Sequence, residues 1–131
     1  LGYRTIGLDV DPRLYRKPGV ALIDLCIQPV ILPAPADVVW SVETAEHLPL
    51  GCVPAYVETL TRNARLAIVL PASQEELPQH LTIKPRGWWV EQIEAGGDFM
   101  LDPLSAKMIR EHSTMQREFL RETGMVFWRS K

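Results

Sequence analysis

The stretch ADVVWSVETAEHLP (residues 36–49) governs how the rest of the chain is interpreted. It opens with an apolar run that ends at Trp40, which is typical of a buried strand. Glu43, Glu46 and His47 follow within seven residues. Titratable side chains directly after a core strand indicate one of two things. Either this is an ordinary strand end and helix start, or it is the rim of a binding site.

On both sides of this stretch, apolar runs alternate with helical or proline-rich segments. Strands are predicted at 3–10, 20–25, 36–42, 66–71, 98–102 and 124–129, and helices at 12–16, 54–65, 87–95 and 103–123. Parallel strands need long crossover connections, so this alternation predicts one α/β domain over residues 1–131. We expect a Rossmann-like, mainly parallel sheet with helices on both faces and an antiparallel last strand.

Composition excludes several classes of protein. The 131 residues are 47% apolar and carry a net charge of -2, so no basic excess favours nucleic-acid binding. No apolar stretch reaches the length that spans a bilayer, which argues against a membrane partner. Cys26 and Cys52 lie outside any metal-binding Cys pair. We therefore expect two buried, reduced thiols and a cytoplasmic protein.

Acidic residues fall at the ends of three successive predicted strands: Asp9, Asp24 and Glu43. In open α/β sheets, ligands bind outside the carboxyl ends of the strands. A carboxylate there accepts hydrogen bonds from the two hydroxyls of a ribose. Asp9 and Asp24 are therefore candidates for a nucleoside pocket, and the alternative for each is a solvated residue that caps the next helix.

Glu46 and His47 are candidates for general acid–base chemistry. No metal ligand set is predicted, because His47, His80 and His112 share no ligand spacing. A nucleophile is not indicated either, since no Gly-x-Ser-x-Gly motif occurs. The alternative for Glu46 is a structural role at a helix start, where the helix dipole favours an acidic side chain.

An ordered set of motifs runs through the chain: Ile6-Gly7-Leu8-Asp9, Ile23-Asp24-Leu25, residues 37–49 (DVVWSVETAEHLP), residues 66–71 (LAIVLP), His80 and Gly87-Trp88-Trp89. This order resembles the class I S-adenosylmethionine-dependent methyltransferases. Within that family it is similar to the branch with Glu-His-Leu after the fourth strand. The resemblance covers residues 3–129 and begins at the family's second strand.

The resemblance implies S-adenosylmethionine as cofactor and a binding site lined by six residues: Asp9, Asp24, Leu25, Ser41, Val42 and Glu43. In that site Asp9 would hold the ribose hydroxyls, and Asp24 would lie beside the adenine. The resemblance also implies that Glu46 and His47 are catalytic and that His80 binds the methyl acceptor. The acceptor is expected to be a small molecule or a protein.

The family's first strand and its Gly-x-Gly-x-Gly turn do not occur in this sequence. We therefore expect that a segment precedes Leu1, or that a homo-oligomer or partner chain covers an open sheet edge. A non-catalytic, methyltransferase-like scaffold or subunit is the alternative function. A third, weaker alternative is an α/β domain that binds another dinucleotide.

Overall fold

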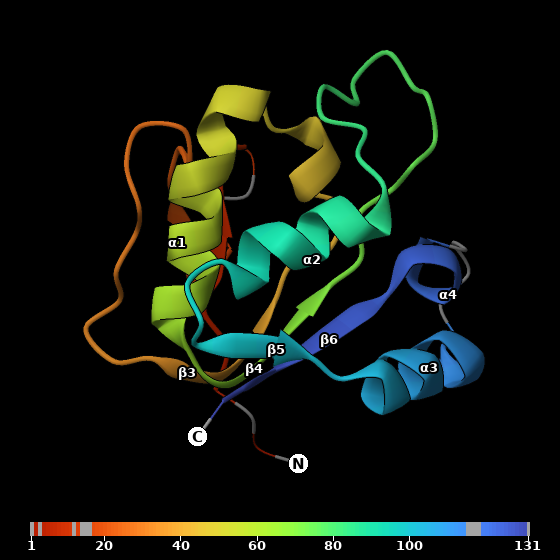
Figure 1. Cartoon of the computed structure of the whole chain (residues 1–131). Helices are drawn as coiled ribbons and strands as arrows, with labels where there is room; N and C mark the ends of the chain where they lie inside the picture. Colours follow the sequence, from red (N-terminus) through yellow and green to blue (C-terminus); the bar gives the residue numbers. More distant parts are fainter. Residues whose placement is uncertain (1, 3, 12, 14–16, 115–118, 131) are drawn as a thin grey trace.

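Strands and helices alternate along the chain in a computed structural model that describes residues 2, 4–11, 13, 17–114 and 119–130 (Figure 1). The strands are β1 (Gly7–Asp9), β2 (Val20–Leu22), β3 (Ala36–Trp40), β4 (Ala64–Leu70), β5 (Phe99–Leu101) and β6 (Met125–Arg129). The helices are α1 (Val53–Asn63), α2 (Arg86–Glu94), α3 (Pro103–His112) and α4 (Phe119–Thr123), with two short 3-10 helices, η1 (Ala45–His47) and η2 (Leu50–Cys52). The chain is thus a mixed α/β protein.

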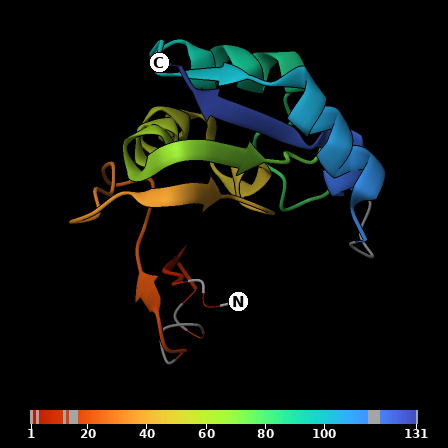
Figure 2. The same cartoon turned by 90° about the horizontal axis from the view of Figure 1, so that it is seen from below.

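The strands form two separate sheets. The larger sheet has the order β3-β4-β6-β5, with β3 parallel to β4 and β6 antiparallel to both β4 and β5. β1 and β2 pair in parallel and lie beyond the β3 edge of the larger sheet (Figure 2). The antiparallel last strand is confirmed. A single continuous sheet is not observed among the described residues.

α1 and α2 cover one face of the larger sheet with a shared apolar core. Val53, Tyr56 and Leu60 are three and four residues apart, so they lie on one side of α1 and are buried. The Tyr56 ring meets the edge of Trp89 from α2, with centroids 6.3 Å apart. The sheet contributes Ile68, Leu70, Phe99, Met125 and Phe127 to this core. Burial of these large side chains is the main stabilising contribution to the fold.

The proline-rich loop that leads into β3 is held by two polar side chains of α1. Thr59 Oγ1 accepts a hydrogen bond from the Val30 N–H at 3.0 Å. Asn63 Oδ1 accepts one from the Leu32 N–H at 2.8 Å, and its Nδ2 donates to the Val30 carbonyl at 2.6 Å. Thr59 and Asn63 are themselves buried, so these bonds satisfy polar atoms that would otherwise destabilise the core.

Three strands are less buried than the sequence predicted. β3 is a strand, but only Val39 among its five residues is not exposed, because β3 pairs with β4 alone in the larger sheet. β2 comes from the nearly continuous apolar run 20–25, yet Leu22 is 46% exposed. β1 and β2 are three residues each, and their small sheet lies apart from the main core. An apolar run shows strand propensity and does not reveal which sheet will cover it.

The predicted helix over 103–123 is wrong as one continuous element. α3 ends at His112, because Ser113 adopts an extended backbone with φ -63° and ψ 126°. α4 then covers Phe119–Thr123. Met108, an apolar residue of α3, is 53% exposed. The predicted helical turn over 12–16 lies largely outside the described residues.

The prediction of two buried, reduced thiols is wrong. Cys26 and Cys52 form a disulfide, and Cys26 is exposed. The bond joins the segment after β2 to the start of α1, so it ties the small sheet to the main core. Because the thiol prediction was the basis for a cytoplasmic location, that location stays a prediction without structural support. Within the described ranges, no helix combines the length and apolar character needed to cross a membrane.

Reduction of this disulfide should destabilise the protein measurably. The two cysteines are 26 residues apart, for which the loop-closure entropy predicts a loss of about 3–4 kcal/mol in the free energy of unfolding. Urea unfolding of the wild type with and without reductant tests this. The double variant Cys26→Ser/Cys52→Ser should have the same free energy of unfolding as the reduced wild type, and reductant should not change it. Equal stabilities of oxidised and reduced wild type would contradict the assignment.

Asp102 should make the stability of α3 depend on pH. Its carboxylate caps the helix by accepting from the Leu104 and Ser105 N–H groups. The Ser105 hydroxyl, followed by the Ser105 N–H, holds the pKa of Asp102 below its ordinary value. A lowered pKa in the folded state means stability that is present at neutral pH and lost as the pH falls through that pKa.

Thermal unfolding of Asp102→Ala and Asp102→Asn from neutral to strongly acidic pH checks this. At neutral pH Asp102→Ala should have a lower melting temperature than the wild type, and this difference in melting temperature should become smaller in acid. Asp102→Asn keeps a side-chain hydrogen-bond acceptor, so its melting temperature at neutral pH should fall less than that of Asp102→Ala. If the difference in melting temperature between Asp102→Ala and the wild type does not change with pH, the carboxylate charge contributes nothing to stability.

Candidate functional site

Two segments that follow adjacent parallel strands meet at one edge of the larger sheet. η1 follows β3 and carries Glu46 and His47, and the loop after β4 carries His80. Because β3 and β4 are parallel neighbours, with Val39 opposite Ile68, their carboxyl ends lie side by side. This is the edge at which open α/β sheets bind ligands.

Glu46 is the buried carboxylate of the site, with 1% of its surface exposed. Its Oε1 accepts a hydrogen bond from the Ser73 N–H at 3.2 Å, and its Oε2 is buried with no hydrogen-bond partner among the described residues. The Glu46 carbonyl accepts from the N–H groups of Leu81 and Thr82 at 2.7 and 3.0 Å. These backbone bonds fasten η1 to the loop that carries His80.

The backbone holds both histidines through their Nδ1 atoms. Nδ1 of His47 lies 3.1 Å from the Gln79 carbonyl, and Nδ1 of His80 lies 2.7 Å from the Glu75 carbonyl. A carbonyl oxygen only accepts, so each Nδ1 is the donor and carries the proton. In the neutral ring Nε2 then holds the lone pair. Each imidazole thus has one nitrogen prepared to accept a proton or bind a ligand.

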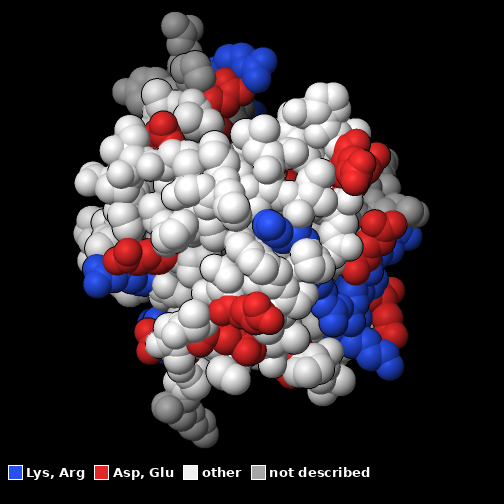
Figure 3. Space-filling view, turned by 45° about the horizontal axis from the view of Figure 1, so that its top comes forward, with Lys and Arg blue, Asp and Glu red and all other residues white. Residues whose placement is uncertain are grey.

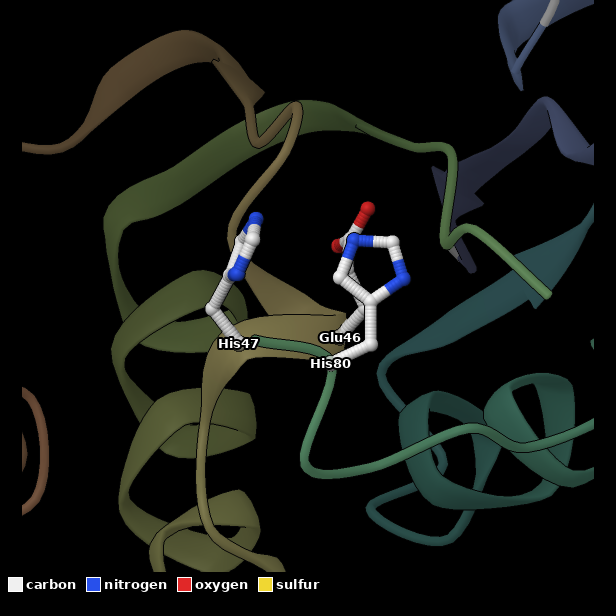
Figure 4. A group of neighbouring side chains, drawn as sticks. All are labelled: Glu46, His47 and His80. Atoms are coloured by element: carbon white, nitrogen blue, oxygen red, sulfur yellow. The ribbon is translucent and has the colours of Figure 1, made fainter. Parts of the chain in front are cut away.

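Figure 4 shows the Glu46, His47 and His80 side chains projecting in the same direction from their backbones. One ligand atom from each lies within 4.8 Å of the others. The His47 and His80 rings meet edge to face with centroids 4.8 Å apart. His80 is 9% exposed and His47 is half-buried, so the cluster is accessible from the His47 side. Sequence spacing did not predict this grouping, because His80 lies 33 positions beyond His47 along the chain.

Ser41 lies at the site but turns its hydroxyl into the protein. It is 8% exposed, and its Oγ is 2.7 Å from the Tyr56 hydroxyl. Burial raises the pKa of the Tyr56 phenol far above its ordinary value. The hydrogen bond with Ser41 opposes that rise, and the nearby Glu46 charge adds to it. Tyr56 therefore stays protonated, and the Ser41–Tyr56 pair fixes the chain where it leaves β3.

The next residues take an unusual backbone path into η1. Glu43 has a φ of 55°, in the left-handed region of backbone conformation that residues other than glycine seldom adopt. Thr44 Oγ1 donates to the Val42 carbonyl at 3.2 Å. Such strained conformations persist only where the surrounding structure enforces them, and they occur often at ligand sites. The predicted cofactor contacts of Val42 and Glu43 stay predictions.

The other predicted cofactor residues lie in the small sheet or in the segment that follows it. Asp9 is the last residue of β1, and its Oδ1 accepts from the Asp11 N–H at 2.8 Å. Asp24 follows β2, and its Oδ1 accepts from the Cys26 N–H at 2.8 Å. Each carboxylate therefore uses one of its two oxygens to close a local turn. Leu25 is partly buried against the main core. The structure thus places these residues on or just after the small sheet, whereas Ser41, Glu46 and His47 follow β3 of the larger sheet.

Sequence reasoning missed the residues that support the site. Tyr56 is fully buried on α1, and no motif in the sequence marks it as part of a site. Ser73 contributes its backbone N–H, and Glu75 and Gln79 contribute backbone carbonyls. Backbone groups carry no residue-type signal, so no sequence pattern identifies them. His112 lies elsewhere, in a cavity lined also by Trp40 and Ile109.

The surface shows no single-sign charged face in the view of Figure 3. Acidic and basic side chains are interspersed there among larger uncharged areas. Several charges are paired at the surface, as in the bonds of Arg65 to Asp37 and of Arg62 to Glu58. This face gives no support for nucleic-acid binding through phosphates.

No protein-family model, curated protein or solved structure matches the chain significantly. Similarity therefore assigns no family, and any function must be argued from the site itself.

The Ser41–Tyr56 bond should contribute measurably to stability. In a double-mutant cycle of Ser41→Ala and Tyr56→Phe, we expect a coupling free energy of about 1 kcal/mol, typical of a buried neutral hydrogen bond. Urea unfolding of the two single variants and the double variant measures it. If the losses in the free energy of unfolding of the two single variants add up to that of the double variant, the two hydroxyls do not interact.

Proposed function

We propose that this protein is a methyltransferase that uses S-adenosylmethionine and holds its methyl acceptor at Glu46, His47 and His80. The observation that carries the proposal is the convergence of these three side chains at the carboxyl ends of two parallel neighbours, β3 and β4. A Rossmann-like methyltransferase sheet places its acceptor groups at that edge. The position of β6, antiparallel between β4 and β5, agrees with the resemblance seen in the sequence.

The residues present fit one half of the cofactor. Asp9 lies at the carboxyl end of β1, paired in parallel with Leu22 of β2, and Asp24 follows that strand. Asp9 would hold the ribose hydroxyls and Asp24, with Leu25, would lie by the adenine. The methionine half has no matching cradle in this sequence, because no glycine-rich turn occurs among its eight glycines. When bound, S-adenosylmethionine supplies an electrophilic methyl group.

The chain's own residues would prepare the acceptor. Nε2 of His47 carries a lone pair and lies on the accessible side of the cluster, so it can take the proton of an acceptor hydroxyl or amine. Glu46, close by and buried, would favour the resulting imidazolium through its negative charge. His80 would position the acceptor from the opposite segment. The mixed surface charge favours a small molecule or a protein as acceptor.

A second candidate is a non-catalytic scaffold with the same fold. Two observations favour it: the carboxylates of Asp9 and Asp24 already close local turns, and they belong to the small-sheet region, whereas the Glu46 cluster follows strands of the larger sheet. In that case the exposed β3, whose Trp40 is 53% exposed, would serve as a contact for a second copy or a partner chain.

Calorimetric titration of the full-length protein with S-adenosylhomocysteine separates the two candidates. We expect binding, weakened by about 1–3 kcal/mol in Asp9→Ala because the ribose hydroxyls lose their acceptor. Asp11→Ala is the matched control, since the Asp11 carboxylate pairs with Arg13 and should leave the affinity unchanged. No detectable binding would overturn the methyltransferase proposal, and an unchanged affinity in Asp9→Ala would remove Asp9 from the site.

A further inference from the structure

We propose that Glu46, His47 and His80 bind a divalent first-row transition metal ion, with Zn²⁺ as the representative cation. The ligands would be Oε2 of Glu46 and the Nε2 atoms of the two histidines. This proposal goes beyond methyl transfer and does not depend on it, because it rests only on the three side chains and their surroundings.

The first argument is the buried carboxylate. Oε2 of Glu46 is buried without a hydrogen-bond partner, and no Lys or Arg forms an ion pair with Glu46 within the described part of the chain. A buried carboxylate that lacks a compensating group is strongly destabilising. A cation bound at Oε2 would supply both the missing partner and the missing charge.

The second argument is the arrangement of the imidazoles. Both Nδ1–H groups donate to backbone carbonyls, at Gln79 and Glu75, and this leaves both Nε2 atoms as lone-pair donors. Metal-binding histidines usually donate their other N–H to a carbonyl or carboxylate, which fixes the tautomer and the ring direction. Here that outer shell is present on both rings.

The third argument is geometry. One possible ligand atom from each of the three residues lies within 4.8 Å of the others. Tetrahedral Zn²⁺ with bonds of about 2.0–2.1 Å would hold its ligand atoms roughly 3.3 Å apart, so binding would draw the three side chains closer together. The backbone bonds from the Glu46 carbonyl to Leu81 and Thr82 already hold the two ligand-bearing segments together. The half-buried His47 provides an entry path for the ion.

The ligand set also selects the class of metal. Two imidazoles and one carboxylate suit Zn²⁺, Fe²⁺ and similar ions, whereas Mg²⁺ and Ca²⁺ prefer sites made of oxygen ligands. Three protein ligands leave at least one position open, as in catalytic metal sites. An acceptor oxygen or nitrogen bound there would lose its proton more readily. The three residues would then activate the acceptor through the metal, in place of direct proton uptake by His47.

Titration of chelator-treated protein with Zn²⁺ by calorimetry tests the proposal. We expect one equivalent to bind and to raise the melting temperature. His47→Ala, His80→Ala and Glu46→Gln should each weaken binding by about 100-fold or more, beyond the losses typical of outer-shell changes. His112→Ala is the matched control, because His112 is exposed and lies outside the cluster.

Circular dichroism shows whether each variant is folded, and His47→Ala should disturb the fold least of the three, because His47 is the least buried ligand. Absence of Zn²⁺ binding would overturn the proposed site. So would an equal loss of Zn²⁺ affinity in His47→Ala and His112→Ala. Preference for Mg²⁺ over Zn²⁺ would overturn the class of metal. Titration with S-adenosylhomocysteine is a separate measurement, so failure of the methyltransferase proposal and failure of this one can be told apart.

Discussion

The parallel pairing of β3 with β4 is the constraint on which the rest of the structure depends. It aligns Val39 with Ile68 and so brings the carboxyl ends of the two strands together. The segments that follow are then close enough for the Glu46 carbonyl to accept hydrogen bonds from Leu81 and Thr82. A register slip of one residue in β4 would turn Ile68 and Leu70 away from the core and would break this alignment.

Around this pairing, the site combines features that a stability argument alone does not explain. A buried carboxylate oxygen has no partner, and Glu43 takes a left-handed conformation just before η1. Departures from well-satisfied structure are expected where a protein keeps groups ready for a ligand. The Ser41–Tyr56 bond and the backbone bonds to both histidines hold the candidate site in one arrangement.

The small sheet relates to the main core in a different way. Among the described residues β1 and β2 pair only with each other, and the disulfide between Cys26 and Cys52 links the segment after β2 covalently to the start of α1. Few large buried side chains come from this region, since the core is built from α1, α2 and the larger sheet. The position of Asp9 and Asp24 relative to the Glu46 cluster thus depends on this link as much as on packing.

Local sequence patterns were sufficient to predict most elements, because periodicity and turn residues act over a few positions. They located α1, α2, β4 and the antiparallel β6, and they marked Glu46 and His47 as candidates from their place after an apolar run. They missed the break after His112, and they failed where distant residues decide: the exposure of β3 and the Cys26–Cys52 bond. The joining of His80 with Glu46 and His47 is the clearest case. Chain spacing carries no information about it, and only the parallel pairing of β3 and β4 brings the two loops into contact.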